Sequence, residues 1–366
     1  MGEAVAAPIT QIGVDDIEHL VLGAQLVSSG GATIGTVPSA WLRRTLAGAG
    51  PVRLVPVSDL SPETLCVPVG NVGSPTVLEE KLPAGEEFVH AVRGIEDRLG
   101  TPAGAVAALD VASINALTPV IAAAQLGLPL VDADGMGRMF PLIELTVWAA
   151  AGLPASPITL VNTHGDVITI DCADNQRIES LARPAIIALG GWCAAALYPM
   201  NAATLARHGI HGSFSQALRL GRTLAEAQER GSPRGADLAR ELGARLLFTG
   251  AVVEVSRPTA AGFARGVVVI ADRTDPDRML RLEVQNECLL ALVDGRVAAA
   301  VPDVICPIEQ GSCLPVGVEQ LYYGQVLDVL CFAADPAWHT PEGLALAGPA
   351  AFGYPLPNEA PPGDQR

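Results

Sequence analysis

Positive charge is scarce in this sequence of 366 residues. It holds 23 lysine and arginine residues against 39 aspartate and glutamate residues, and its net charge is −16 at pH 7. No run of basic residues interrupts this pattern. Because proteins bind phosphate backbones through clustered lysine and arginine, the composition argues against a nucleic-acid partner.

Paired cysteines and long apolar runs are also missing. The seven cysteines, an odd number, include no C-x-x-C spacing, which argues against a disulfide framework and a structural zinc site. We expect the closest pair, Cys306 and Cys313, to be free thiols. No apolar stretch reaches about 18 residues without a polar break, and residues 1–11 have neither a basic nor an apolar signal region. We therefore expect a soluble cytoplasmic protein that does not enter a membrane.

Lysine is almost absent, because Lys81 is the only lysine in the chain. In an alanine-, glycine- and proline-rich sequence that otherwise uses arginine, the remaining lysine indicates a role for a compact ammonium that approaches a ligand or changes its protonation state. The alternative is chance retention of an exposed lysine.

Residues 52–152 alternate between strand-like and helix-like segments. Short apolar runs predict buried strands, and apolar residues at helical spacing predict helices between and before them. The strands are expected at 52–57, 65–69, 106–111 and 128–131, and the helices at 17–27, 39–46, 86–99 and 116–126. This order is typical of parallel β-α-β units with right-handed crossovers. We therefore predict an α/β fold, with a mainly parallel sheet in a domain spanning residues 1–155.

The pattern changes after residue 155. A hairpin is predicted at 158–161 and 167–170, and helices at 175–189 and at 215–229, the latter behind a Ser213–Gln216 capping box. From residue 246 to 330 the chain is rich in strands, expected at 246–255, 266–271, 279–284, 288–293 and 296–301. We predict a second, α+β domain over residues 156–354 that contains a small β-barrel, followed by a flexible tail at 355–366.

The chain is organised around residues 131–141, where an apolar run breaks into Asp132, Asp134, Gly135 and Arg138 before a helix-like pattern at 140–151. Such a strand-to-helix turn lies at the carboxyl end of a strand, where open α/β sheets bind ligands. Calcium binding of the EF-hand type does not fit, because the fifth and twelfth positions carry no oxygen ligand. The structural alternative is that Asp132 caps a helix.

Three other polar or glycine-containing loops are expected at the same edge. They are Ser28 to Thr33, Gly70-Asn71, and Asp110 to Asn115. Because the carboxyl ends of parallel strands share one edge of a sheet, we predict that the loops converge on a small-molecule site between the domains.

Several stretches together resemble the S-methyl thiohydantoin desulfurase-like family over nearly the whole chain. They are Pro68 to Pro75, Glu80-Lys81, Leu128 to Phe140, Gln285-Asn286-Glu287, Pro302-Asp303, Tyr323-Gly324-Gln325 and Gly348 to Tyr354. The resemblance implies an N-terminal three-layer α/β domain and a C-terminal domain with a β-barrel. It also implies removal of sulfur from a thiohydantoin ring, or a related hydrolytic step on a cyclic imide or amidine.

Two loops depart from the family pattern. Leu26-Val-Ser-Ser-Gly-Gly-Ala32 stands where the family has L-G-T-G-G-G-G, and Asp110-Val-Ala-Ser-Ile-Asn115 stands where it has E-x-G-G-x-N. Both loops lie on the predicted site edge. The departures allow a specialised, biosynthetic activity on a related ring.

The leading hypothesis is a hydrolase acting on a small five-membered ring, with a carboxylate that assists the attack of water. Asp132 or Asp134 is the candidate base if one carboxylate raises the pKa of the other, and Glu287 would reach the site across the interdomain cleft. Donors to the developing negative charge are Lys81, Arg138, Asn71 and Asn115. The predicted substrate-binding residues are Ser29, Gly30, Gly31, Asn71, Asp110, Asn115, Gly135 and Asn286.

No cofactor is predicted. Asp132, Asp134 and Glu287 are hard oxygen ligands that suit a divalent metal, but no spacing requires one. The expected partners are a small heterocyclic substrate and further copies of the chain in a homo-oligomer. A non-catalytic binding subunit of a hydantoinase-like assembly is the alternative.

Overall fold

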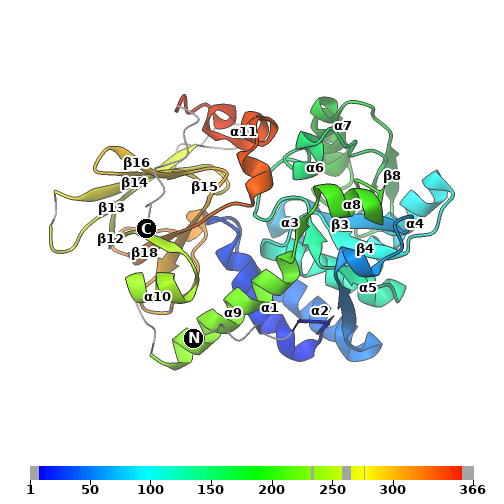
Figure 1. Cartoon of the computed structure of the whole chain (residues 1–366), viewed down its shortest axis with the longest axis horizontal. Helices are drawn as coiled ribbons and strands as arrows, with labels where there is room; N and C mark the ends of the chain where they lie inside the picture. The colour runs from blue at the N-terminus through cyan, green and yellow to red at the C-terminus, as the bar shows by residue number, and fades with distance from the viewer. Residues whose placement is uncertain (1–7, 232–234, 258–264, 276, 357–366) are drawn as a thin grey trace.

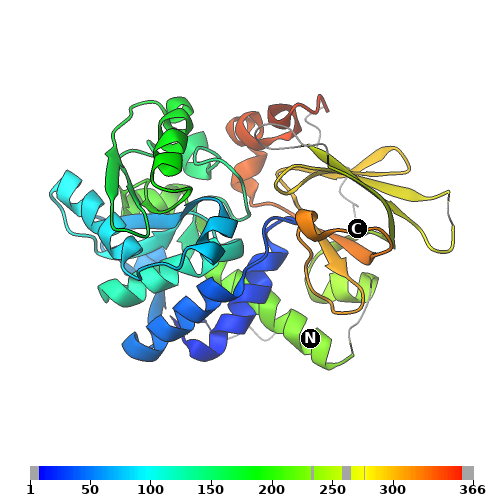
Figure 2. The same cartoon turned by 180° about the vertical axis from the view of Figure 1, so that it is seen from behind.

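The computed structural model describes residues 8–231, 235–257, 265–275 and 277–356. Most of the tail predicted at 355–366 therefore lies outside the described residues. The chain forms two large sheets that lie side by side, each with its own helices (Figures 1 and 2). A small two-stranded sheet pairs β6 (Ala133–Asp134) with β11 (Ile210–His211). In the described part of the chain, no helix is both long and apolar enough to cross a membrane.

The first sheet is mixed, with a parallel centre. Its strand order is β1-β2-β5-β4-β3-β9-β7-β8, with β2, β5, β4 and β3 parallel and the outer pairs antiparallel. The strands are β1 (Gln11–Ile12), β2 (Val52–Val55), β3 (Leu65–Gly73), β4 (Ala105–Ala108), β5 (Leu130–Val131), β7 (Ile158–Val161), β8 (Val167–Ile170) and β9 (Trp192–Ala196), and β10 (Met200–Asn201) pairs with β3. The predicted α/β fold with a mainly parallel sheet is confirmed.

Helices cover both faces of this sheet. Alternation along β3 sends Val67 and Val69 into one core and Cys66 into the other, because successive side chains of a strand point to opposite faces. The first core is covered by α1 (Ile17–Leu26), α2 (Thr36–Ala49), α4 (Glu87–Leu99) and α5 (Thr118–Leu126), and the second by α6 (Val147–Ala150), α7 (Asn175–Ala188) and α8 (Ala202–His208). A short helix α3 (Pro75–Glu80) follows β3.

One predicted helix is mostly absent. Of residues 140–151, only α6 is helical, and it starts behind Thr146, whose hydroxyl accepts the Ala149 amide. Before it the chain turns irregularly and buries Phe140, Ile143 and Leu145. These apolar residues are spaced as on a helix, but they fill a core from an irregular loop. Pro141 has no amide hydrogen to donate, which interrupts regular helical hydrogen bonding.

The first sheet extends beyond the predicted boundary at residue 155. The hairpin of β7 and β8 forms as expected, but β7 pairs with β9, and β9 pairs with β3. The predicted boundary thus separates strands that share one sheet. The contact between β3 and β9 joins segments more than 100 residues apart, which no local pattern reveals.

The second sheet is antiparallel and curved like half a barrel (Figure 1). Its order is β16-β15-β14-β13-β12-β18-β17, with strands β12 (Arg245–Ser256), β13 (Gly266–Ala271), β14 (Met279–Val284), β15 (Cys288–Val293), β16 (Arg296–Ala300), β17 (Val304–Glu309) and β18 (Val326–Phe332). Alternating residues of β13 and β14, such as Val268, Ile270, Leu280 and Leu282, fill its core. Helix α10 (Ala236–Glu241) packs on β12, whereas α11 (Pro341–Ala347) contacts α6 and places Ala347 in the core that α6, α7 and α8 cover.

Helix α9 (Ser213–Glu229) connects the two sheets and packs along α1. The helices touch at glycines, because a Cβ on Gly23 would lie 1.7 Å from the Ala217 carbonyl oxygen, and one on Gly221 would lie 1.7 Å from that of His19. At its far end, Gln228 Nε2 donates to the Ser312 carbonyl at 2.9 Å. One continuous helix therefore contacts both parts of the molecule.

Candidate active site

Hydrogen bonds join the four loops predicted to converge. The Asn115 Oδ1 atom accepts from Asn71 Nδ2 at 2.8 Å, and Asn115 Nδ2 donates to Asp110 Oδ2 at 2.6 Å. The Ser113 amide donates to Ser28 Oγ at 2.9 Å, and the Val111 amide donates to Asp134 Oδ2 at 2.9 Å. The predicted convergence is confirmed, and it places the loops between the first sheet and the second.

Asp110 and Asp134 form a buried carboxyl pair at this junction. Burial raises the pKa of Asp110 to about 7, although bonds from Asn115 and the Ala112 amide oppose the rise. Burial and the nearby Asp110 raise the pKa of Asp134 to about 8, against bonds from Ser213, Val111 and Gly137. Both carboxyls are surrounded by protein donors, so their evident function is to hold the loops together.

Asp132 caps a helix. Its Oδ1 atom accepts the amides of Phe214 at 2.9 Å and Ser215 at 3.2 Å, and its Oδ2 atom accepts the Ser215 hydroxyl. These groups belong to the first turn of α9, where unpaired amides favour a carboxylate. The predicted Ser213–Gln216 capping box is wrong, because Gly212 is the N-cap residue and the Ser213 hydroxyl donates to Asp134.

Lys81 and Gly135 have local structural surroundings. Lys81 is exposed, and its ammonium donates to the Gly190 carbonyl at 3.1 Å. It makes no bond to Asp132 or Asp134, so the expected approach to the acidic turn is not formed. A Cβ on Gly135 would lie 2.7 Å from the Trp148 ring, so glycine is needed there for close packing.

The loop of Ser29, Gly30 and Gly31 fastens the first part of the chain to the second sheet. The Cys288 amide donates to the Ser29 carbonyl at 2.7 Å, and the Val318 amide donates to the Gly30 carbonyl at 2.7 Å. A Cβ on Gly31 would overlap the Met139 sulfur. The loop was predicted to bind substrate, and in the structure its carbonyls are used to join the two sheets.

Two serines in these loops have left-handed backbone conformations, Ser29 with φ 55° and Ser113 with φ 47°. Both stand where the glycine-rich pattern described above has glycine, which adopts such angles without steric cost. Their hydroxyls compensate in part, since Ser29 Oγ accepts the Ile305 amide at 3.1 Å and Ser113 Oγ donates to the Ala32 carbonyl at 2.6 Å.

Arg138 and Glu287 both have buried side-chain atoms without hydrogen-bond partners, and Glu287 alone among the described residues has two such atoms; the other atoms of this kind belong to His19, Gln125, Glu144 and Trp148. Arg138 is 1% exposed and donates to the carbonyls of Met139, Pro302 and Asp303, but its Nη2 atom has no partner. Glu287 is also 1% exposed, and neither of its carboxyl oxygens has a hydrogen-bond partner. Burying a carboxyl group without hydrogen-bond partners lowers the stability of the folded protein.

The two groups interact electrostatically. Burial raises the pKa of Glu287 to about 7, and the Arg138 charge opposes the rise. Burial lowers the pKa of Arg138 to about 10, and Glu287 and Asp303 oppose that change. The second sheet therefore brings a carboxyl group of perturbed pKa close to an arginine on the acidic turn.

The junction also contains residues that were not predicted to be site residues. Trp192 Nε1 donates to Asn71 Oδ1 at 3.0 Å, and Ser213 and Asp303 contribute as described above. Trp192 lies outside the predicted loops, and no local signal marked it. Ser213 was predicted only as part of a capping box, and Asp303 only as part of the family resemblance. Asn286 is partly buried beside Glu287. Within the described residues, no group of three or more His, Cys, Asp or Glu side chains is placed to hold a metal.

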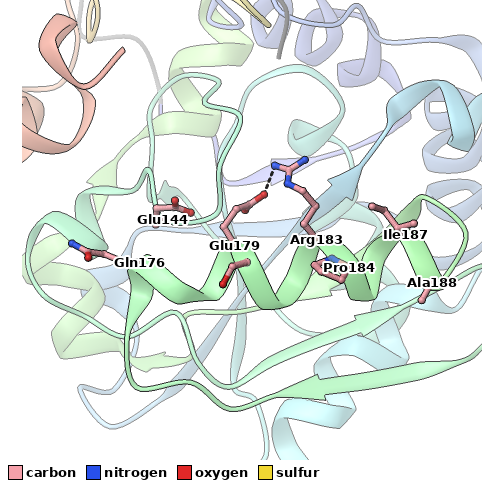
Figure 3. A pocket seen from close by; sticks show the side chains of 8 residues that line it. Glu144, Gln176, Glu179, Arg183, Pro184, Ile187 and Ala188 are labelled. Carbon is pink, nitrogen blue, oxygen red and sulfur yellow. Dashed lines mark hydrogen bonds and ion pairs between the residues drawn. The ribbon is translucent and has the colours of Figure 1, made fainter. Parts of the chain in front are cut away.

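Two hollows open near this junction. A cleft of about 400 Å³ lies between the chain after Arg138, the turn before Glu287 and the segment around α11. A wider, shallower groove of about 680 Å³ runs along α7, from Gln176 and Glu144 past the Glu179–Arg183 ion pair to Ile187 and Ala188 (Figure 3). The hollows share Glu144 and Gln176. Of the two, the cleft is lined by residues close in sequence to Arg138 and Glu287, namely Pro141, Leu142 and Gln285.

Comparisons with known proteins agree over nearly the whole chain. Residues 15–172 match the family model described as S-Me-THD-like, N-terminal domain, and residues 173–360 match that of the S-Me-THD-like, C-terminal domain. A crystal structure of a protein from Chromobacterium violaceum is 26% identical, with a TM-score of 0.78 over 95% of this chain and 99% of that chain. We found no match among curated proteins.

Proposed function

Because this chain belongs to the S-Me-THD-like family, we propose that it is an enzyme that hydrolyses a small five-membered ring of thiohydantoin, hydantoin or cyclic imide type. The family is named for a desulfurase. The bond broken would be the C–S bond of a thiohydantoin derivative, or a C–N bond of a related ring.

The observation that carries the proposal is the unfilled pair of Glu287 and Arg138. Two carboxyl oxygens and one guanidinium nitrogen, all buried and without partners, form a set of acceptors and donors that suits a polar ring and a water molecule. Fully buried polar groups in proteins are nearly always hydrogen-bonded. A bound substrate would satisfy them.

Glu287 is the better candidate for the general base than the aspartates of the acidic turn. Asp132 is used to cap α9, and Asp134 accepts bonds from Ser213, Val111 and Gly137. Glu287 has no such partners, and a pKa of about 7 is close to the value at which a carboxylate removes a proton from water most effectively near neutral pH.

The proposed step follows from these positions. The Glu287 carboxylate takes a proton from water while the water oxygen bonds to the electron-poor ring carbon. The Arg138 guanidinium donates a hydrogen bond to the oxygen or nitrogen atom on which negative charge develops as this carbon becomes tetrahedral. The C–S or C–N bond then breaks, and the proton on Glu287 passes to the leaving sulfur or nitrogen, which returns the carboxylate.

The Asp110–Asp134 pair would support this chemistry indirectly. Asp134 accepts the Gly137 amide at 3.0 Å, next to Arg138. The pair thereby fixes the turn that carries the arginine, and Asn71 and Asn115 fix Asp110 in the same network.

A panel of S-methyl thiohydantoins, hydantoins and cyclic imides tests the proposal. Thiol release is followed with a thiol reagent and ring opening by ultraviolet absorbance. Glu287→Gln should lower turnover by about 10²-fold or more, and Arg138→Lys by about 10²- to 10³-fold.

The matched control is Glu283→Gln, since Glu283 is a partly exposed carboxylate on β14 that pairs with Arg281. It should keep wild-type turnover. Binding of a ring without turnover would instead indicate a non-catalytic binding subunit, and full activity of Glu287→Gln would show that the base lies elsewhere.

A further inference from the structure

The cleft of about 400 Å³ has largely apolar walls. Pro141, Leu142 and Leu145 line it from the chain after Arg138, and Leu346 and Phe352 line it from α11 and the turn that follows. Figures 1 and 2 show α11 between the second sheet and the helices of the first. The hollow is in the size range of small-molecule sites.

Two of these walls contact the immediate neighbours of Arg138 and Glu287. Gln285 lines the cleft, and its amide donates to the Glu287 carbonyl at 2.9 Å in a tight turn. On the other side, Phe140 stacks on Phe352 with ring centroids 6.2 Å apart, and the Arg138 guanidinium lies 4.3 Å from the centre of the Phe140 ring. Neither Arg138 nor Glu287 lines the cleft itself, but Phe140 and the turn at Gln285 connect its walls to both groups.

Two polar residues of the cleft, Arg265 and Gln285, have partners within the protein, whereas the Oε2 atom of Glu144, which also lines the cleft, is buried without a hydrogen-bond partner. Arg265 donates to the Phe352 carbonyl at 2.8 Å and lies over the Tyr354 ring. Gln285 is also engaged. The leucines Leu142 and Leu346 are partly exposed, so a ligand in the cleft would gain mainly by covering apolar surface.

We propose that this cleft binds an apolar substituent of the ring substrate and so determines which rings the protein accepts. This inference rests on the proposed function. The substituent would be an isobutyl or benzyl group, of the kind found on rings derived from leucine-like or phenylalanine-like amino acids. The ring itself would lie toward Arg138 and Glu287.

The substituent series gives the expected effect. Each methylene buried from water improves binding by about fourfold, so an isobutyl ring should bind about 10- to 60-fold more tightly than a methyl ring. Benzyl should behave like isobutyl. An acidic carboxymethyl substituent should gain nothing, because Arg265 is already bonded to the Phe352 carbonyl.

The experiment measures Kd by calorimetry for non-hydrolysable rings bearing hydrogen, methyl, isobutyl, benzyl or carboxymethyl groups, and kcat/KM for the matching substrates. In Leu142→Asn and Leu346→Ser the isobutyl-to-methyl ratio should fall at least fivefold. The control is Leu314→Ser, which changes an exposed leucine outside the cleft and should leave the ratio unchanged.

The outcomes separate this inference from the proposed function. Substituent-dependent binding that the leucine variants weaken, without turnover of any ring, supports the cleft and contradicts the enzyme. Turnover that depends on Glu287 but not on the substituent contradicts the cleft alone. A preference for the carboxymethyl ring, or leucine variants that keep the wild-type ratio, also overturns the inference, and no binding of any ring overturns both.

Discussion

Glu287→Gln should make the protein more stable at alkaline pH while it removes activity. Glutamine has the shape of the protonated glutamic acid and carries no charge, so the variant resembles wild type at low pH. The Arg138 side chain keeps its bonds to the carbonyls of Pro302 and Asp303 in both proteins. The comparison therefore isolates the cost of ionising one buried carboxyl group.

The magnitude follows from the pKa of Glu287, which burial raises from the ordinary 4.5 to about 7. The folded state binds the Glu287 proton more tightly than the unfolded state does. Protonated Glu287 therefore contributes its full stabilisation below its pKa in the unfolded chain, and this stabilisation is lost as pH rises through its pKa in the folded protein. Each pKa unit corresponds to about 1.4 kcal/mol, so wild type should lose about 3 kcal/mol by about pH 8.5, and less than about 1 kcal/mol by about pH 5.

Urea unfolding followed by tryptophan fluorescence measures this, since Trp41, Trp148, Trp192 and Trp338 are all buried. The free energy of unfolding of Glu287→Gln relative to wild type should rise by about 2 to 3 kcal/mol between about pH 5 and pH 8.5. Glu283→Gln should show no such rise. A difference between Glu287→Gln and wild type that is the same at both pH values would refute the reasoning, because Glu287 would then titrate normally.

Further variants test three individual contacts. Asp132→Ala should lower the stability measured by thermal unfolding by about 1 to 2 kcal/mol, because α9 loses its cap. Asp132→Asn should keep turnover, and loss of turnover in a stable Asn variant would show that Asp132 is a catalytic residue. Gly221→Ala places a Cβ 1.7 Å from the His19 carbonyl oxygen and should lower the free energy of unfolding by about 3 kcal/mol or more. Its control Gly48→Ala, in α2 with nothing within 4 Å of the new Cβ, should raise that free energy by up to about 1 kcal/mol, and equal effects of the two variants would contradict the contact between α1 and α9. Lys81→Arg should keep near wild-type turnover, since the exposed ammonium bonds only to Gly190 among its described contacts, and a large loss would return Lys81 to the site.

Local patterns were sufficient for much of the fold. The strands 266–271, 279–284 and 288–293 match β13, β14 and β15 residue for residue. Apolar and polar residues alternate along β14, whereas β13 and β15 are short apolar runs, and both patterns are typical of strands. The meeting of the Asn71, Asp110 and Asp134 loops followed from parallel topology alone. These features depend on neighbouring residues or on the general geometry of sheets.

What was missed depends on contacts between distant segments. Asp132 caps a helix that begins about 80 residues later, and only the tertiary fold reveals that its carboxylate is already used. The sequence at 140–151 has helical spacing, but its apolar residues fill a core around Trp338 in an irregular loop. Lys81 was singled out by its rarity, which says nothing about its exposure.

The contact between α1 and α9 also bears on whether the protein is modular. The two family models meet between residues 172 and 173, yet α1 belongs to the first half and α9 to the second, and β9 of the second half completes the sheet beside β3 of the first. Cutting the chain there would expose the Gly23–Ala217 contact and an open sheet edge in both fragments. Each fragment should aggregate when produced alone, and the two should reassemble into one particle when produced together, because neither half can complete its sheet and helix contacts without the other.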